Sequence, residues 1–436
     1  MSSLAANRRP VAILFLIVFI DLVGFGLLIP VIPLYAKFFG ANEFTGSLLI
    51  ATYSLLQFLA APVLGRLSDE RGRRPILVLS LAGATVAWVL FGFAESIAGA
   101  VGTATGLWIL FIARGIAGAM GGNIAAANAY IADITGPDER AKGLGILGAA
   151  FGVGFVFGPA IAAVMTQPSV LQSIAPLTPP GIPVTVYSVP SFIAAGLSMT
   201  ALMLAVVALP EPARSDAMTP QGQGRVSRLR EALHTPGLFA LIVAFFVVSF
   251  AFSSFESQFI FLTNDRLGYG TVANGVLLTY IGVLIVIVQG GLIGPLTRRF
   301  GEANLAVTGV LIQLATLWLV PFAVGVRSLP AVGILDSGGV ALAIVATPLA
   351  FGNGITNVSL NALVSRTAGA EEQGGVFGLT QSAGSLARTV GPATAGLLYV
   401  TAGYWSPFVV SAVLFAPVTV LLVRSAALSG EDRTAL

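Results

Sequence analysis

The chain has 436 residues, of which 56% are hydrophobic and only 9% are charged. A soluble domain carries roughly a quarter charged residues, so this composition excludes a globular protein surrounded by water. The formal net charge of +3 is spread over several segments and indicates no nucleic-acid partner, and the absence of cysteine excludes disulfides, iron–sulfur clusters and thiol catalysis.

Long apolar stretches predict membrane-spanning helices. Each can cross about 30 Å of hydrocarbon, and backbone amides in lipid must bond within a helix or a closed barrel. The stretches are continuous rather than short and alternating, which favours helices. We expect twelve spans, at 11–36, 44–65, 75–98, 107–132, 141–165, 191–209, 238–262, 272–296, 305–326, 340–364, 375–400 and 405–423.

The segments between the spans indicate domains and orientation. The basic N-terminus leads into the first stretch without a small-residue cleavage site, so we expect a retained helix and not a signal peptide. With that end inside, inner segments hold seventeen of the 22 lysines and arginines, which places both termini in the cytoplasm. We predict a bundle over 1–209, a charged cytoplasmic linker over 210–237 and a second bundle over 238–436. The proline-rich outer segment 166–190 is expected to be an irregular loop.

Three segments of the first half recur in the second half in the same order, which indicates a duplication. Residues 128–145 align with 361–378, Gly158-Pro159 with Gly391-Pro392, and 65–72 with 294–301 within a few residues of the same offset. The sequence therefore predicts an all-α membrane protein with twelve transmembrane helices in two pseudo-symmetric six-helix bundles. Parallel repeats of this kind hold their substrate near the middle of the membrane, between the halves.

Three motifs resemble the major facilitator superfamily. Residues 65–74 (Gly-Arg-Leu-Ser-Asp-Glu-Arg-Gly-Arg-Arg) are similar to its loop signature between spans two and three. Residues 113–118 (Ala-Arg-Gly-Ile-Ala-Gly) resemble its fourth-helix motif, and residues 154–159 (Gly-Phe-Val-Phe-Gly-Pro) resemble the fifth-helix motif of its antiporters. The resemblance covers essentially the whole chain and implies the major facilitator fold, with export favoured over uptake.

The opening helices, at residues 21–30 and 53–57, look like those of tetracycline-type drug/proton antiporters. Those exporters carry a histidine in the eighth span, where this chain has Ile285. They also carry an aspartate in the ninth span, which here has no acidic residue. The resemblance therefore implies the broader drug-efflux group and not tetracycline itself as the substrate.

Four ionisable residues stand out within the predicted spans, where charge is costly: Asp21, Arg114, Glu256 and Arg388. We predict that Asp21 carries the coupling proton. Glu256 would carry a proton or neutralise a cationic substrate, unless its span ends early and leaves it at the outer mouth. Arg114 would tune a neighbouring charge, and Arg388 would hold an anionic group or a backbone carbonyl. Each of the four could instead form a buried structural pair or face a polar seam.

The loop after span two has the features of a conformational gate. Gly65 and Gly72 permit a tight reversal, and Asp69 can accept from amides at a neighbouring helix N-terminus, where the helix dipole favours an anion. Arg71 or Arg73 can reach Asp133 at the end of span four. These contacts would latch the carrier in its outward-facing state, and ordinary positive-inside topology is the alternative.

Gly158 and Pro159 are expected to act in the same gate. Proline removes an amide and bends its helix, and glycine relieves the resulting clash or allows close helix packing. We interpret the glycines mainly as packing residues.

Neutral polar side chains are predicted to line the substrate cavity together with Arg388. They are Tyr53, Gln57, Asn128, Gln289, Asn357, Asn361 and Gln381. The 28 phenylalanines favour an aromatic pocket for a lipophilic molecule. The single histidine, His234, falls in the linker, so proton coupling would depend on carboxylates.

The sequence thus predicts a monomeric, proton-coupled antiporter of the inner cell membrane that exports drugs or amphipathic metabolites. It would use the proton gradient, with no cofactor and no metal. The alternative transporter is a facilitator or symporter for a sugar or an organic anion, with Arg388 as the anion site. A channel is disfavoured by the duplicated carrier scaffold. A membrane enzyme is disfavoured because the sequence shows no nucleophile–base set, metal cluster or phosphate loop.

Overall fold

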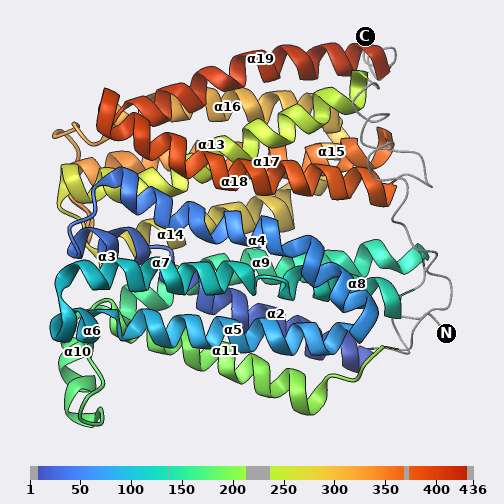
Figure 1. Ribbon diagram of the computed structural model, residues 1–436. Coiled ribbons are helices and arrows are strands. Elements are labelled where there is room, and N and C mark those ends of the chain that lie inside the picture. Colours follow the sequence, from blue (N-terminus) through green and yellow to red (C-terminus); the bar gives the residue numbers. More distant parts are fainter. Residues whose placement is uncertain (1–7, 136, 213–235, 368–372, 430–436) are drawn as a thin grey trace. The chain divides into compact units, whose positions relative to one another are not determined.

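The computed structural model describes residues 8–135, 137–212, 236–367 and 373–429 of the chain (Figure 1). Within these ranges the elements are helices, joined by turns and by one isolated bridge between Val332 and Leu335. In the part of the chain that the structure describes, eleven helical segments are long and apolar enough to cross a membrane. The segment α18 (Gln373–Ala402) is a twelfth of similar length, less apolar because it contains Arg388 and many Gly, Ser and Thr residues. The all-α membrane fold with twelve spans is confirmed.

The first six spans follow the predicted order. They are α2 (Arg8–Leu28) with α3 (Ile32–Phe38), α4 (Glu43–Arg71), α5 (Arg73–Gly92), α7 (Thr103–Ala119) with α8 (Asn123–Ile134), α9 (Pro137–Met165) and α11 (Ser188–Ala208). The short helix α6 (Ala94–Val101) joins spans three and four. The segment 166–190 is more regular than expected, because Pro168 at the first turn of α10 (Pro168–Ile174) favours helix initiation and a 3₁₀ turn, Ala175–Leu177, follows.

The second six spans are similarly long. They are α13 (Pro236–Leu267), α14 (Thr271–Ile287) with α15 (Ile293–Phe300), α16 (Glu302–Ala323), α17 (Ser337–Thr367), α18 and α19 (Ser406–Ser429). The described helices form two compact units: α2 to α11 with α14 up to Gly282, and α13 with the rest of the chain from Val283. The bundle boundaries at 209 and 238 remain a prediction, since most of the expected linker, including His234, lies outside the described residues.

Three of the spans are interrupted within the described residues. Span one breaks at 29–31, where Pro30 cannot donate to the helix ladder, and span four breaks at Met120–Gly122. In span eight a π-helical turn, Val288–Leu292, separates α14 from α15. Such turns insert one extra residue into a helix and often occur at functional sites.

The first unit has two apolar cores. One surrounds Tyr35, Trp88 and Phe91, and the other surrounds Leu77 and Tyr130. Close helix packing joins them, since α2 lies against both α9 and α11, and α11 against α5. In the second unit α16 packs on α17 and α13 packs on α18. These packed helix pairs position the polar side chains inside each unit.

The internal repeat is visible in the backbone. Gly72 separates α4 from α5 with φ +107° and ψ 160°, and Gly301 separates α15 from α16 with φ +74° and ψ 157°. Side chains other than hydrogen are strongly disfavoured in this region of φ and ψ. The repeat aligns these two glycines, so the structure supports the register that was predicted from the sequence.

Candidate functional site

Asp21 lies inside the first unit, in the middle of α2, and is 8% exposed. Asn123 Nδ2 of α8 donates to Asp21 Oδ2, and Ser198 Oγ of α11 donates to Asp21 Oδ1 at 3.0 Å. Both donors are neutral. Among the described residues, no basic side chain forms an ion pair with Asp21. The carboxylate therefore connects spans one, four and six without a counter-cation.

Arg114 is 2% exposed and belongs to a separate polar group in the same unit. Its guanidinium carbon lies 4.5 Å from the centroid of the Tyr53 ring and 5.9 Å from that of Phe25, distances typical of cation–π contacts. Gln57 Nε2 donates to Tyr53 Oη at 3.2 Å and to the carbonyl of Gly121 at 3.1 Å. The predicted residues Tyr53, Gln57 and Arg114 are thus brought together at the break in span four.

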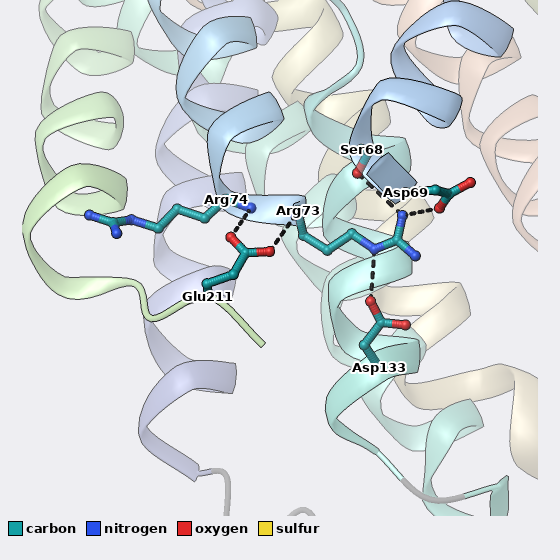
Figure 2. A network of polar contacts seen from close by, with 6 residues as sticks. All are labelled: Ser68, Asp69, Arg73, Arg74, Asp133 and Glu211. Atoms are coloured by element: carbon teal, nitrogen blue, oxygen red, sulfur yellow. Dashed lines mark hydrogen bonds and ion pairs between the residues drawn. The ribbon is translucent and has the colours of Figure 1, made fainter. Parts of the chain in front are cut away.

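Arg73 is the centre of an ion-pair network at the start of α5 (Figure 2). Its Nε lies 2.7 Å from Asp133 Oδ2, and its Nη1 contacts Asp69 Oδ1 and lies 3.3 Å from Ser68 Oγ. Arg73 is buried, so the two carboxylates balance a charge that would otherwise be costly in this place. The structure selects Arg73 over Arg71 as the partner of Asp133, because Arg71 is exposed in the last turn of α4.

Glu211 completes this network and was not identified from the sequence (Figure 2). Its carboxylate accepts from the backbone amides of Arg73 at 2.6 Å and Arg74 at 3.0 Å. These amides are orphan donors at the N-terminus of α5, where the helix dipole favours an anion. At this helix end the role expected of Asp69 therefore belongs to Glu211, while Asp69 binds the Arg73 side chain.

The same contacts hold the end of span six. Arg74 Nε donates to the carbonyl of Ala205 at 3.2 Å and its Nη2 to that of Val206, so its side chain points away from Arg73 (Figure 2). Tyr130 Oη donates to the carbonyl of Pro210 at 2.6 Å. Arg74 therefore attaches the end of span six, and Glu211 and Tyr130 attach the segment after it, to spans three and four.

The other predicted gate residues lie inside helices. Gly65 is within α4, and a Cβ added to it would meet no atom within 4 Å. A Cβ on Gly158 would lie 2.4 Å from the carbonyl carbon of Gly26, so α9 and α2 touch backbone to backbone. Pro159 follows inside a continuous α9. The close contact agrees with a packing role for Gly158.

In the second unit the charged candidates lie on different helices. Glu256 is half-buried in α13, within the run Ser253, Ser254, Ser257 and Gln258, whose members are buried. Arg388 is half-buried in α18, and its Nη2 donates to Ser385 Oγ at 3.0 Å. Their roles in coupling and substrate binding remain predictions.

The neutral candidates differ in exposure. Asn128 is half-buried in α8, and Gln289 is half-buried in the π-helical turn of span eight. Asn357 is half-buried in α17, whereas Asn361 and Gln381 are exposed. Asn357 and Asn361 share one face of α17. Three further polar residues were not predicted from the sequence, because neutral polar side chains recur along the spans and nothing distinguishes these from the others: Asn123, Ser198 and Asn353.

The architecture is that of a multi-pass α-helical membrane protein, and comparison with known proteins defines its family. The Major Facilitator Superfamily matches residues 14–392. The chain therefore belongs to this superfamily of transporters. It is 30% identical over 405 residues to the tetracycline resistance protein, class C, of Escherichia coli, covering 91% of this chain and 92% of that protein. It is 31% identical over 424 residues to the class G tetracycline resistance protein of Vibrio anguillarum, covering 94% of this chain and 95% of that protein.

Solved structures show the same fold. The human organic anion transporter MFSD10 superimposes with a TM-score of 0.64 at 24% identity, covering 95% of this chain and 99% of that chain. The nucleoside transporter NupG superimposes with a TM-score of 0.68 at 11% identity, covering 96% of this chain and 99% of that chain. The major facilitator fold and the relationship to tetracycline efflux proteins, both expected from the motifs, are confirmed.

Proposed function

We infer that this transporter is a proton-coupled antiporter that exports lipophilic drugs or amphipathic metabolites by alternating access. The observation that carries this proposal is the environment of Asp21. Asp21 is buried, accepts from two neutral donors and has no basic partner among the described residues. Ionisation of a carboxylate in such an environment costs free energy, because no nearby positive charge compensates for the loss of water. A proton is the simplest counter-charge, so loading and release of that proton can be coupled to a change of conformation.

The relatives support export over uptake. The class C and class G proteins are named for resistance to tetracycline, and they cover nearly the whole chain. Ile285 stands where the resemblance to tetracycline-type antiporters implies a histidine, so we do not extend tetracycline to this chain. The proposed substrate class is therefore a small lipophilic molecule, exported across the inner cell membrane by a monomer with both termini in the cytoplasm.

Glu256 and Arg114 are proposed to assist coupling in different ways. Glu256 is half-buried, so it can exchange a proton with solvent or face a cationic substrate. Arg114 is buried under Tyr53, and its fixed charge would tune the polar group around Gln57. Neither residue offers Asp21 a direct ion pair in the described structure.

We propose the Arg73 network as the conformational latch. Arg73 binds Asp69 and Asp133 on two different spans, and Glu211 holds the start of α5. A network that fixes spans two, three, four and six together would stabilise one end-state of the cycle and would have to change for the other. Substitution of Asp69 should therefore slow turnover more than it weakens equilibrium binding.

A facilitator or symporter for an organic anion is the second candidate. Arg388 favours it, because a half-buried guanidinium in the middle of α18 that donates to Ser385 could also bind a carboxylate. A sugar substrate has no comparable support among the charged residues.

Proton release from inverted membrane vesicles separates the two candidates. Vesicles from an efflux-deficient host are acidified by respiration, and lipophilic drugs selected by a susceptibility panel are then added. An antiporter releases protons when the drug enters, and a facilitator or a symporter does not. Drug accumulation without proton release would contradict the antiport proposal.

A further inference from the structure

Three asparagines form a ladder along one face of α17. Asn353, Asn357 and Asn361 are four residues apart, which places them above one another on a helix. Asn361 Nδ2 donates to the carbonyl of Asn357 at 2.8 Å, and Asn357 Nδ2 donates to Asn353 Oδ1 and to the Asn353 carbonyl, each at 3.0 Å. Each of these two amides thus donates toward the N-terminal end of α17.

The ladder ends on an unused donor. Asn353 is 4% exposed, and among the described residues none accepts a hydrogen bond from its Nδ2. Buried donors are almost always paired, because an unpaired donor loses the hydrogen bond that water would give it. By contrast Gln313 Nε2, similarly buried beside the same helix, donates to Thr356 Oγ1 at 3.0 Å. Asn353 is therefore poised to bind an acceptor from outside the chain.

The helix around Asn353 is fixed by close contacts on other faces. A Cβ on Gly352 would lie 2.9 Å from the Gly309 carbonyl of α16, so these two helices touch through their backbones. A Cβ on Gly354 would lie 2.9 Å from Val288 in the π-helical turn, and 3.7 Å from Gln289 Cγ. Asn353 thus lies between Gly352 and Gly354, two glycines at which α17 packs closely on its neighbours. The side chain of Gln289 lies next to Gly354.

The ladder is a feature of the second half alone. The repeat that aligns Asn361 with Asn128 places Asn357 on Ile124 and Asn353 on Met120. A polar requirement of the shared scaffold would be expected in both halves. The two additional asparagines therefore serve something specific to this half, and the unused donor indicates binding.

We propose that Asn353, with Asn357 one turn further along α17, forms a subsite that binds an uncharged oxygen acceptor of the substrate, a carbonyl or a hydroxyl. This proposal rests on the proposed export function and specifies part of its substrate class. Neutral amides cannot offset the desolvation of an anion, so an uncharged oxygen fits this ladder better than a carboxylate. Because Asn353 is covered here, access requires the rearrangement that a carrier undergoes in each cycle.

Binding to the purified full-length protein in detergent tests the subsite. Quenching of tryptophan fluorescence would measure the binding of three probes. Chloramphenicol has carbonyl and hydroxyl oxygens, ethidium has no oxygen, and salicylate is an anion. Asn353→Leu removes the donor at similar volume, and Asn353→Ser keeps a shorter one. Asn304→Leu is the matched control, since Asn304 is exposed and donates to the Phe300 carbonyl of the preceding helix.

We expect wild type and Asn304→Leu to bind chloramphenicol equally, Asn353→Leu to bind it at least tenfold more weakly, and Asn353→Ser to lie between them. Ethidium binding should change less than twofold in all variants. The proposal is overturned if wild type does not bind chloramphenicol or if Asn353→Leu binds it normally. It is also overturned if Asn353→Leu weakens the binding of ethidium or salicylate as much as that of chloramphenicol. Chloramphenicol binding without proton release from vesicles would contradict the antiport function and leave the subsite intact.

Discussion

Arg366 Nη2 lies 2.8 Å from Glu302 Oε1, which joins the end of α17 to the start of α16. The repeat places Arg366 on Asp133 and Glu302 on Arg73. The second half therefore preserves the ion pair of the first half with its charges exchanged. An ion pair connects the same two aligned positions in both halves, and at each position the charge in one half is opposite to the charge in the other.

The two pairs should differ in their contribution to stability. Arg73 is buried between two carboxylates, whereas the Arg366 side chain is 59% exposed and screened by solvent. We expect Asp133→Asn to destabilise the protein by about 1 to 3 kcal/mol, because a buried charge loses a partner. Glu302→Gln should cost less than about 1 kcal/mol. Thermal melting in detergent checks the order, and a larger loss for Glu302→Gln would contradict this explanation.

The exchanged charges also predict a rescue. Glu302→Arg alone places two cations together and should lower the melting temperature. Adding Arg366→Glu restores opposite charges in the order found in the first half. Recovery of most of the lost stability in the double variant is expected, and additive losses would show that the contact itself is unimportant.

Gly72 and Gly301 allow a matched test of the Glu211 contact. Alanine at either position should cost about 1 to 3 kcal/mol, since both glycines adopt positive φ with extended ψ. At Gly72 the new Cβ would also lie 2.5 Å from Glu211 Oε1, whereas at Gly301 it would meet nothing within 4 Å. Gly72→Ala should therefore melt at a lower temperature than Gly301→Ala. Equal melting temperatures would argue against a structural role for Glu211.

The contact between spans one and five can be tested within one helix. A Cβ on Gly158 would collide with backbone atoms of Gly26 and Leu27, at 2.4 and 2.5 Å, which side-chain movement cannot relieve. A Cβ on Gly148, also in α9, would meet no atom within 4 Å. We expect Gly158→Ala to reduce the yield of folded protein and Gly148→Ala to be neutral or to stabilise α9 by about 0.5 to 1 kcal/mol. Monodisperse yield by size-exclusion chromatography provides the comparison, and equal yields would argue against the backbone contact.

The features that the sequence predicted correctly are those with a local or repeated signal. Apolar length identified the spans, and the duplication aligned Gly72 with Gly301. The pairing of an arginine at the start of span three with Asp133 followed from opposite charges at neighbouring helix ends. Each inference needed only the periodicity of a helix, its position in the membrane, or a comparison of the two halves.

Partners that are distant in sequence could not be found in this way. Ser198 reaches Asp21 across 177 positions of the chain, and nothing distinguishes it from other serines of span six. Glu211 falls in the segment 210–237, which the sequence predicts to be a linker, so nothing in the sequence associates its carboxylate with the start of α5. The π-helical turn at Val288–Leu292 depends on one extra residue in an otherwise regular apolar helix, which composition does not reveal.

Proton release by the Asp21→Asn variant tests the central claim most directly. Asparagine keeps the size of the side chain and cannot carry a proton between two charge states, so drug-driven proton release from inverted vesicles should disappear while drug binding remains. Asp265→Asn is the matched control and should release protons as wild type does. In the unaltered protein Asp265 Oδ2 accepts a hydrogen bond from Tyr399 Oη at 2.7 Å. Normal pH-dependent efflux by Asp21→Asn would contradict the mechanism.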